Sequence, residues 1–166
     1  MDDLLLAHLR SHRIFAALSD IEAETLASAG KVLALRPEQE LFRAGDRADG
    51  FYIVLNGALD VLVEERTLAR IDAGEVVGEM GLVTAHTRSA TVRAIAPVRV
   101  WHLDGRGFEA LLRAGDPMAT GILLGVARDL GRRFRDVVNE AARLVPDVAK
   151  SPGGPELLDR LHWGDL

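Results

Sequence analysis

Between residues 31 and 103 the sequence consists of short runs of β-branched, aromatic and other apolar residues, each bounded by turn residues. The runs are KVLALR, ELFR, FYIVLNG, ALDVLVE, TLARIDAG, SATVRAI and VRVWHL, and the pairs between them include Arg36-Pro37, Gly45-Asp46, Asn56-Gly57, Ala73-Gly74 and Ala96-Pro97. The Asn56-Gly57 pair predicts a hairpin, because both residues tolerate a positive φ. Strands this short and closely spaced favour an antiparallel β-barrel or jelly roll of about eight strands over a parallel α/β sheet, which needs long helices between its strands.

The segments on either side of this β-region are predicted to be helical. In residues 1–30, Ser19 and Glu22 fit a capping box, Gly30 supplies a helix stop, and the apolar side is formed by Ile14, Phe15, Leu18, Ile21 and Leu26. In residues 104–145, Asp104 caps a helix over 105–112, and Asp116-Pro117 begins a long helix that runs to about Val145. The predicted fold class is therefore α+β, an antiparallel barrel or jelly roll flanked by N-terminal helices and a long C-terminal helix.

The long helix carries an apolar seam whose spacing alternates between four and three residues. Its members are Leu123, Ala127, Leu130, Phe134, Val137, Ala141 and Leu144. This spacing is typical of a coiled coil, so the 117–145 helix either forms a homodimer or packs on the barrel of its own chain. Residues 146–166 read as a linker and a short tail, in which PELLDRLHW could cover a pocket or dock on the core. The last residues look like a finished tail.

Composition excludes several classes of function. Cysteine is absent, which excludes disulfides, thiolate metal sites and a cysteine nucleophile. The net charge is −5, and the arginines at 128–135 are best explained as a solvated helix face, so we expect no nucleic-acid partner. No run is long and apolar enough to cross a membrane, and MDDLLLAHLR lacks the features of a signal peptide, so we expect a cytoplasmic protein.

Neither a metal site nor an enzyme is expected. The histidines at 8, 12, 86, 102 and 162 show no ligand spacing. Metal oxygenases built on jelly rolls need two histidines and a carboxylate that project inward. His102 is the single histidine within a predicted strand.

The most informative stretch is GEMGLVTAHTRSATVRA at residues 78–94. Gly78 permits an unusual backbone angle and close approach of a ligand. Glu79 suits the hydroxyls of a polyol, and Arg88 offers a permanently charged fork for phosphate oxygens. The Ser89 hydroxyl and the N–H groups of Ser89 and Ala90 can join an anion site. The residues thus suggest a sugar phosphate in the mouth of a barrel, and the alternative is a plain Glu79–Arg88 salt bridge.

This stretch resembles the phosphate-binding cassette of the cyclic nucleotide-binding domain family, of the type found in the catabolite activator protein and the regulatory subunit of protein kinase A. The resemblance extends upstream through LFRAGDRADGFYIVLNGALDVLV and covers about residues 10–145. It implies that Glu79 binds the ribose 2′-hydroxyl beside the backbone of Gly78 and Met80. It further implies that Arg88 binds the cyclic phosphate with the help of Ser89 and Ala90. A serine at position 89 favours cAMP over cGMP within this family.

Two departures from the family pattern bear on function. Transcription factors of the family continue into a winged helix-turn-helix, whereas only about twenty residues follow the long helix of this chain. In addition, Val137 and Val138 stand where the activator protein offers hydroxyl side chains to the adenine. The resemblance therefore leaves apolar capping of the purine as the contact expected from this helix.

These observations lead to one functional hypothesis and two alternatives. The first is a non-catalytic sensor module in which cyclic nucleotide binding moves the C-terminal helix and so acts on an unknown protein partner or on self-association. One alternative is a structural or interaction module of the same fold that binds no nucleotide. The other is the sensor part of a truncated transcription factor.

Overall fold

The computed structural model describes residues 3–81 and 87–144. The chain divides into two compact units, Met1–Asp129 and Leu130–Leu166, and the boundary falls inside the long helix α5 (Pro117–Leu144). The first unit contains both sheets and most of the helices. The described part of the second unit is the helical segment 130–144, and each unit is considered by itself.

The N-terminal helices are α1 (Asp3–Ser11), the 3-10 helix η1 (Arg13–Phe15) and α2 (Asp20–Ala29). The predicted capping box is present: the Ser19 side chain accepts from the backbone N–H of Glu22, and the Glu22 carboxylate accepts from the backbone N–H of Ser19 at 2.8 Å. One expectation was wrong: Ile21 is 77% exposed, because the buried side of α2 is formed by Ala23, Leu26 and Ala27. Gly30 follows the last residue of α2, as predicted, with a φ of −104°, and its small size matters because a Cβ there would overlap the ring of Trp101.

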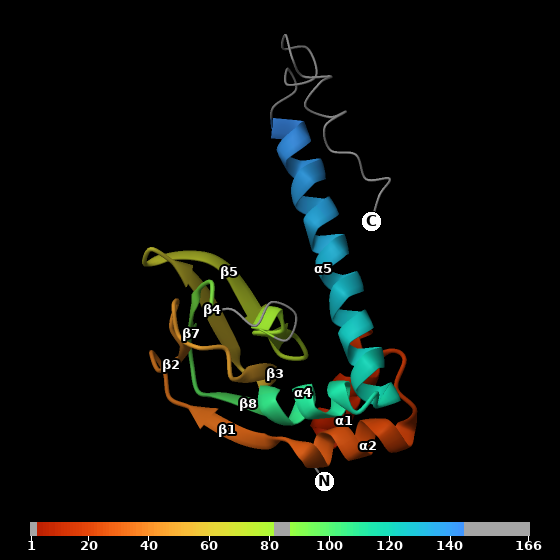
Figure 1. Cartoon of the computed structure of the whole chain (residues 1–166). Helices are drawn as coiled ribbons and strands as arrows, with labels where there is room; N and C mark the ends of the chain where they lie inside the picture. The colour runs from red at the N-terminus through yellow and green to blue at the C-terminus, as the bar shows by residue number, and fades with distance from the viewer. Residues whose placement is uncertain (1–2, 82–86, 145–166) are drawn as a thin grey trace. The chain divides into compact units, whose positions relative to one another are not determined.

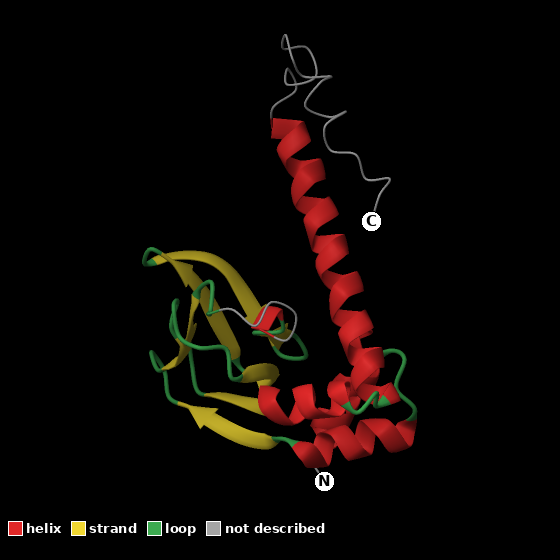
Figure 2. Ribbon diagram, in the orientation of Figure 1, coloured by secondary structure: helices red, strands yellow, loops and turns green. Residues whose placement is uncertain are grey.

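The strands form two antiparallel four-stranded sheets, shown in yellow in Figure 2. One sheet has the order β1-β8-β3-β6 and contains β1 (Lys31–Leu35), β8 (Val98–Asp104), β3 (Gly50–Asn56) and β6 (Val76–Val77). The other has the order β2-β7-β4-β5 and contains β2 (Glu40–Phe42), β7 (Thr91–Ala94), β4 (Ala58–Val63) and β5 (Arg66–Asp72). The α+β jelly roll is thus confirmed, whereas a closed barrel is not formed.

The Asn56-Gly57 turn differs from its prediction. Gly57 has a φ of +81°, as expected, but β3 and β4 on either side of the turn belong to different sheets. The turn therefore carries the chain from one sheet to the other and makes no hairpin. The tight hairpin lies between β4 and β5, where Glu64 and Glu65 have φ values of 49° and 61°. Glutamate is not a typical residue for positive φ, which is why this turn cannot be predicted from the sequence.

Aromatic packing joins the helices to the sheets. Phe51 of β3 packs against Phe15 of η1, Trp101 of β8 and Phe108 of α4 (Gly105–Arg113), with ring centroids 6.0, 6.0 and 6.5 Å away. The helices α1, α2 and α4 accordingly gather at one end of the sheets in Figure 1. Gly50 and Tyr52, at the same end of β3 as Phe51, contact Arg88 of the 78–94 cassette.

Both predicted caps of the C-terminal helices are present. The Asp104 carboxylate accepts from the N–H of Gly107 at 3.3 Å, and that of Asp116 accepts from the N–H of Ala119 at 3.0 Å. Within the first unit, α5 is buried through Met118, Ala119, Ile122 and Val126. This face is offset from the predicted seam, of which Leu123 is half-buried and Ala127 exposed. Val145 and the 146–166 tail lie outside the described residues.

Candidate functional site

Arg88 is at the centre of the candidate site. Its backbone N–H donates to the carbonyl of Asp46 at 2.8 Å, and its own carbonyl accepts from the N–H of Gly45 at 2.8 Å. The adjacent Thr87 forms an isolated β-bridge with Arg47. The 45–47 loop therefore holds the backbone of the cassette just before β7, and the Arg88 side chain enters the protein, where only 6% of the residue remains exposed.

The guanidinium of Arg88 is held by three acceptors. Nη1 donates to the carbonyl of Gly78 at 3.0 Å, while Nη2 donates to the carbonyl of Gly50 at 2.9 Å and to Oδ1 of Asp49 at 2.6 Å. Nε, which is also buried, has no hydrogen-bond partner among the described residues. Because an arginine carries five N–H donors, this arrangement leaves donor capacity on the guanidinium.

Two aromatic rings flank the same guanidinium. Its Cζ lies 4.1 Å from the ring centroid of Phe42 and 5.6 Å from that of Tyr52. Both distances lie within the range of cation–π attraction, which strengthens when the site is shielded from water. The rings replace part of the hydration that the cation loses on burial.

Asp49 connects Arg88 to Tyr52 and His102. The Tyr52 hydroxyl donates to the Asp49 carboxylate at 3.1 Å, and Nε2 of His102 lies 3.9 Å from Oδ2 of Asp49. Tyr52 and His102 are paired directly across β3 and β8, which explains why their rings stack with centroids 4.5 Å apart. The four side chains thus form one continuous cluster of charged and titratable groups.

Burial and charge shift the pKa values in this cluster. Burial, together with the Asp49 carboxylate, raises the pKa of Tyr52 to about 12. Burial alone would raise the pKa of Asp49, but the hydrogen bonds from Arg88 and Tyr52 outweigh it and hold the pKa below its usual value. Burial lowers the pKa of His102, although Asp49 acts in the opposite direction. At neutral pH the cluster therefore contains an ionised Asp49, a charged Arg88, a protonated Tyr52 hydroxyl and a neutral His102.

The residues that open the cassette lie against the arginine. Gly78 has a φ of +82°, and a Cβ at this position would overlap Nη1 of Arg88, so glycine is required for both conformation and space. Glu79 is buried, with 4% of the residue exposed, and Met80 and Gly81 begin a helical turn. A Cβ added at Gly81 would lie 2.6 Å from the Cβ of Ala48, so a glycine at position 81 allows this turn to lie close to the 45–49 loop.

The remaining predicted site residues are less enclosed. Met80 is largely exposed, Ser89 is exposed and Ala90 is half-buried. Val137 and Val138 are exposed residues of the second unit. The structure thus brings Gly78 and Arg88 into contact, and the ligand-binding roles predicted for the whole set remain predictions.

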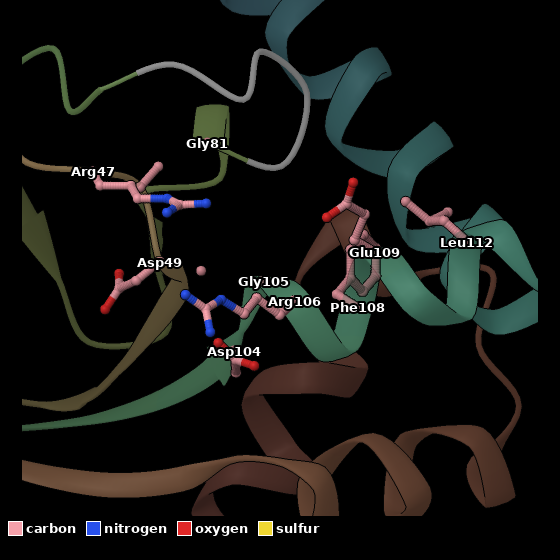
Figure 3. Close-up of a pocket in the computed structure, with 11 residues that line it drawn as sticks. Arg47, Asp49, Gly81, Asp104, Gly105, Arg106, Phe108, Glu109 and Leu112 are labelled. Carbon is pink, nitrogen blue, oxygen red and sulfur yellow. The ribbon is translucent and has the colours of Figure 1, made fainter.

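A cavity of about 400 Å³ lies next to this cluster, between the 47–50 loop, the start of the cassette turn and α4. In Figure 3 the side chains of Arg47, Asp49 and Arg106 lie at one end and those of Phe108, Glu109 and Leu112 at the other. Asp49 and Gly50, the partners of the Arg88 guanidinium, belong to its lining, whereas the cassette residues predicted to bind ligand do not. The cavity therefore adjoins Asp49 and Gly50, which bind the Arg88 guanidinium, rather than the residues predicted to bind ligand.

Sequence reasoning missed the partners of Arg88. Phe42, Asp49 and His102 are distant from the cassette in sequence, and Tyr52 lies within the run FYIVLNG, where nothing in the sequence distinguishes it. Asp49 stands in the Gly- and Asp-rich loop before β3, which is the one sequence feature that could have drawn attention to it. Over residues 3–81 and 87–144, no cluster of three or more potential ligand side chains could hold a metal, and no helix could span a membrane.

Comparisons with known proteins agree with this architecture. The sequence model of the cyclic nucleotide-binding domain matches residues 32–114. An uncharacterized protein of Mycobacterium tuberculosis is 42% identical over 96 residues, which are 58% of this chain and 19% of that protein. An uncharacterized NTE family protein of Mycobacterium bovis is 32% identical over 123 residues, or 74% of this chain and 21% of that protein. The chain thus spans about a fifth of the length of these curated relatives.

Solved structures with the same fold include domains from bacteria and a parasite. The N-terminal domain of a transcriptional regulator from Streptomyces coelicolor is 29% identical with a TM-score of 0.67, covering 79% of this chain and 94% of that one. The regulatory domain of Toxoplasma gondii PKA, solved with cAMP, is 27% identical with a TM-score of 0.61, covering 65% and 43%. A cyclic nucleotide-binding domain from Methylobacillus flagellatus has a TM-score of 0.72 at 24% identity, covering 87% and 83%.

Proposed function

We propose that this chain, which belongs to the cyclic nucleotide-binding domain family, is a non-catalytic sensor module whose preferred ligand is cAMP. One observation carries the proposal: a buried guanidinium, Arg88, is anchored on one side by Asp49 and two carbonyls and retains an unused Nε–H. A buried cation with spare donors suits an anionic group such as a cyclic phosphate.

We assign the proposed contacts as follows. Arg88 binds the phosphate, and Ser89 and the N–H of Ala90 add donors to it. The buried Glu79 accepts a hydrogen bond from the ribose 2′-hydroxyl, with the backbone of Gly78 and Met80 alongside. Val137 and Val138 supply an apolar contact to the purine. The solved Toxoplasma domain contains cAMP, which supports the choice of this nucleotide, and cGMP is the competing ligand.

The Arg88–Asp49 ion pair also bears on the alternative module that binds no nucleotide. If the pair serves stability alone, the arginine has its partner and no ligand is needed. One feature favours the sensor: Arg88 keeps a buried, unused Nε–H, which a purely structural ion pair does not require.

Isothermal titration calorimetry with cAMP and cGMP tests the proposal on the full chain. We expect saturable binding, with cAMP the tighter ligand. Arg88→Gln removes the charge opposite the phosphate and should weaken binding at least about tenfold, more than Ser89→Ala, because hydrogen bonds to charged groups contribute about 1.5–3 kcal/mol. Arg70→Gln, which removes an exposed arginine paired with Asp72 on β5, is the matched control and should bind as the wild type does. Absence of binding by the folded wild type would leave the structural module as the better assignment.

We further propose a cytoplasmic location and an output that acts through the C-terminal helix. A ligand can move this helix only if it binds one helix position more tightly than another. The receiver is then either an unknown protein partner or a second copy that pairs through the 117–145 helix. The likeness to the N-terminal domain of a transcriptional regulator favours one further role, the sensor part of such a regulator. An intact-mass measurement on the protein from its natural source would show whether a further domain follows.

A further inference from the structure

The cluster formed by Arg88, Asp49, Tyr52 and His102 contains a buried histidine that the proposed function does not use. His102 is 6% exposed and stacks on Tyr52, and its Nε2 has no hydrogen-bond partner among the described residues. The closest carboxylate oxygen is Oδ2 of Asp49, 3.9 Å away, which is too long for a hydrogen bond. The other oxygen of the same carboxylate binds Arg88. Asp49 therefore stands between the proposed phosphate site and the histidine.

The charges of the cluster are balanced before an anion arrives. Arg88 and Asp49 form a neutral pair. The other charged groups that act on His102 are Lys31, its cross-strand partner on β1, and Asp104 at the end of β8, and these two shift its pKa in opposite directions. Tyr52, from β3, stays uncharged because its pKa is raised to about 12.

Binding a cyclic phosphate would add one negative charge beside this cluster, in which Arg88, Tyr52 and His102 are buried and the Asp49 side chain is 58% exposed. An uncompensated charge is costly in such surroundings, and a neighbouring group can offset it by changing its protonation state. His102 is the group in the cluster that titrates in the neutral range. Its Nε2 needs to approach Oδ2 of Asp49 by about 1 Å to form a charge-assisted hydrogen bond.

We propose that His102 takes up a proton from solvent when a cyclic phosphate binds Arg88, and that its Nε2–H then donates to Oδ2 of Asp49. This inference rests on the proposed function and adds a proton to the binding equilibrium. The ligand-free protein binds no proton at His102 near neutral pH, because burial keeps the pKa of this histidine below its ordinary value. In the complex, the added negative charge raises this pKa. Affinity should therefore be highest at low pH and fall, by up to about tenfold per pH unit, between the two pKa values.

The decisive experiment is calorimetry of cAMP binding to the full chain in two buffers that differ in ionisation enthalpy, at about pH 6 and about pH 8. Proton uptake makes the apparent enthalpy depend on the buffer. We expect this dependence near pH 6, its loss near pH 8, and its loss at both values in His102→Gln. The control His8→Gln removes a histidine that contacts the carbonyl of Leu55 and should retain the dependence.

Each outcome decides the question. Saturable binding with equal enthalpies in both buffers at about pH 6 overturns the proposal, as does uptake that persists in His102→Gln. Absence of saturable binding to either nucleotide shows instead that the proposed function is wrong. If His102→Gln does not fold, the pKa of His102 in the wild type can be measured by nuclear magnetic resonance with and without cAMP. A pKa that is unchanged or lower in the complex refutes the inference.

Discussion

At the scale of single residues, the site depends on how a guanidinium is buried without losing its charge. A buried arginine needs acceptors for its N–H groups and a counter-charge, or the cost of desolvation exceeds any gain. Arg88 obtains acceptors from Gly50 and Gly78, a counter-charge from Asp49 and ring faces from Phe42 and Tyr52. Its position is thereby set before any ligand binds, which reduces the entropy lost on binding.

Gly78→Ala should disturb this arrangement directly. The substitution forces alanine into a φ of +82° and pushes its Cβ into Nη1 of Arg88. Gly115→Ala is the matched control, because Gly115 has a φ of +71° and open space around it. The control should cost about 1–2 kcal/mol of unfolding free energy, and Gly78→Ala about 1–3 kcal/mol more, since it adds overpacking to the backbone strain.

Urea unfolding of both variants measures this difference, and calorimetry measures the accompanying loss of cAMP affinity. Equal destabilisation by the two substitutions would show that the position of Nη1 of Arg88 does not require a glycine at position 78.

At the scale of elements, the position of α5 on the first unit depends on a close crossing with η1. A Cβ added at Gly125 would overlap the backbone of Ile14. One turn earlier, a Cβ added at Gly121 would lie 3.7 Å from the Cβ of Ala17. The buried Asp129 ends this stretch, with Oδ1 3.3 Å from Nε of Arg13. Because the obstacle at Gly125 is main chain, no rotamer change can relieve it. The first-unit part of α5, the helix proposed to transmit the signal, is therefore positioned by close contact with the backbone of η1.

Two glycine substitutions in α5 should act in opposite directions. Gly125→Ala should lower the unfolding free energy by about 1–3 kcal/mol or more, because η1 must move away. Gly131→Ala meets no described atom within 4 Å and should raise it by up to about 1 kcal/mol through helix propensity. Urea unfolding followed by far-ultraviolet circular dichroism provides the measurement. Destabilisation by both variants would contradict this account of the crossing.

At the scale of the whole molecule, the second unit carries exposed apolar side chains on its helix. Phe134, Val137 and Val138 are 53%, 66% and 47% exposed. Their spacing of three and four residues places them on one face of the helix. Both arrangements that the seam allows would bury this face and gain free energy from its aromatic and branched residues, and the dimer is the one that a mass measurement can test.

The dimer is tested by sedimentation equilibrium over a range of concentrations. We expect a mass that rises toward twice 18.0 kDa, and Val137→Glu should shift the equilibrium to monomer by placing a charge in the interface. Arg143→Gln changes the net charge by the same amount on the opposite side of the helix, beside Glu140, and should leave the equilibrium unchanged. A monomer at every concentration would refute dimerisation through this helix.

Much of the architecture could be predicted from the sequence because it depends on local rules. The strand runs, the caps at Ser19, Asp104 and Asp116 and the start of α5 at Pro117 follow from periodicity and from side chains that satisfy free N–H groups nearby in sequence. The family was predicted from the cassette stretch and is confirmed by the sequence model that matches residues 32–114. The predictions at Asn56-Gly57 and Ile21 were wrong because tertiary structure overrode the local pattern. The Asn56-Gly57 turn connects strands of two different sheets, and α2 buries a face that does not include Ile21.

The sequence by itself determined the jelly-roll class, the family and the two charges of the cassette, Glu79 and Arg88, because these are properties of short, continuous stretches. Only the tertiary structure decided what surrounds Arg88. Asp49, Tyr52 and His102 reach it from a loop and two paired strands, and pairing between distant strands leaves no local pattern in a single sequence. Whether the arginine is a surface charge or a buried, anchored cation depends on those long-range contacts.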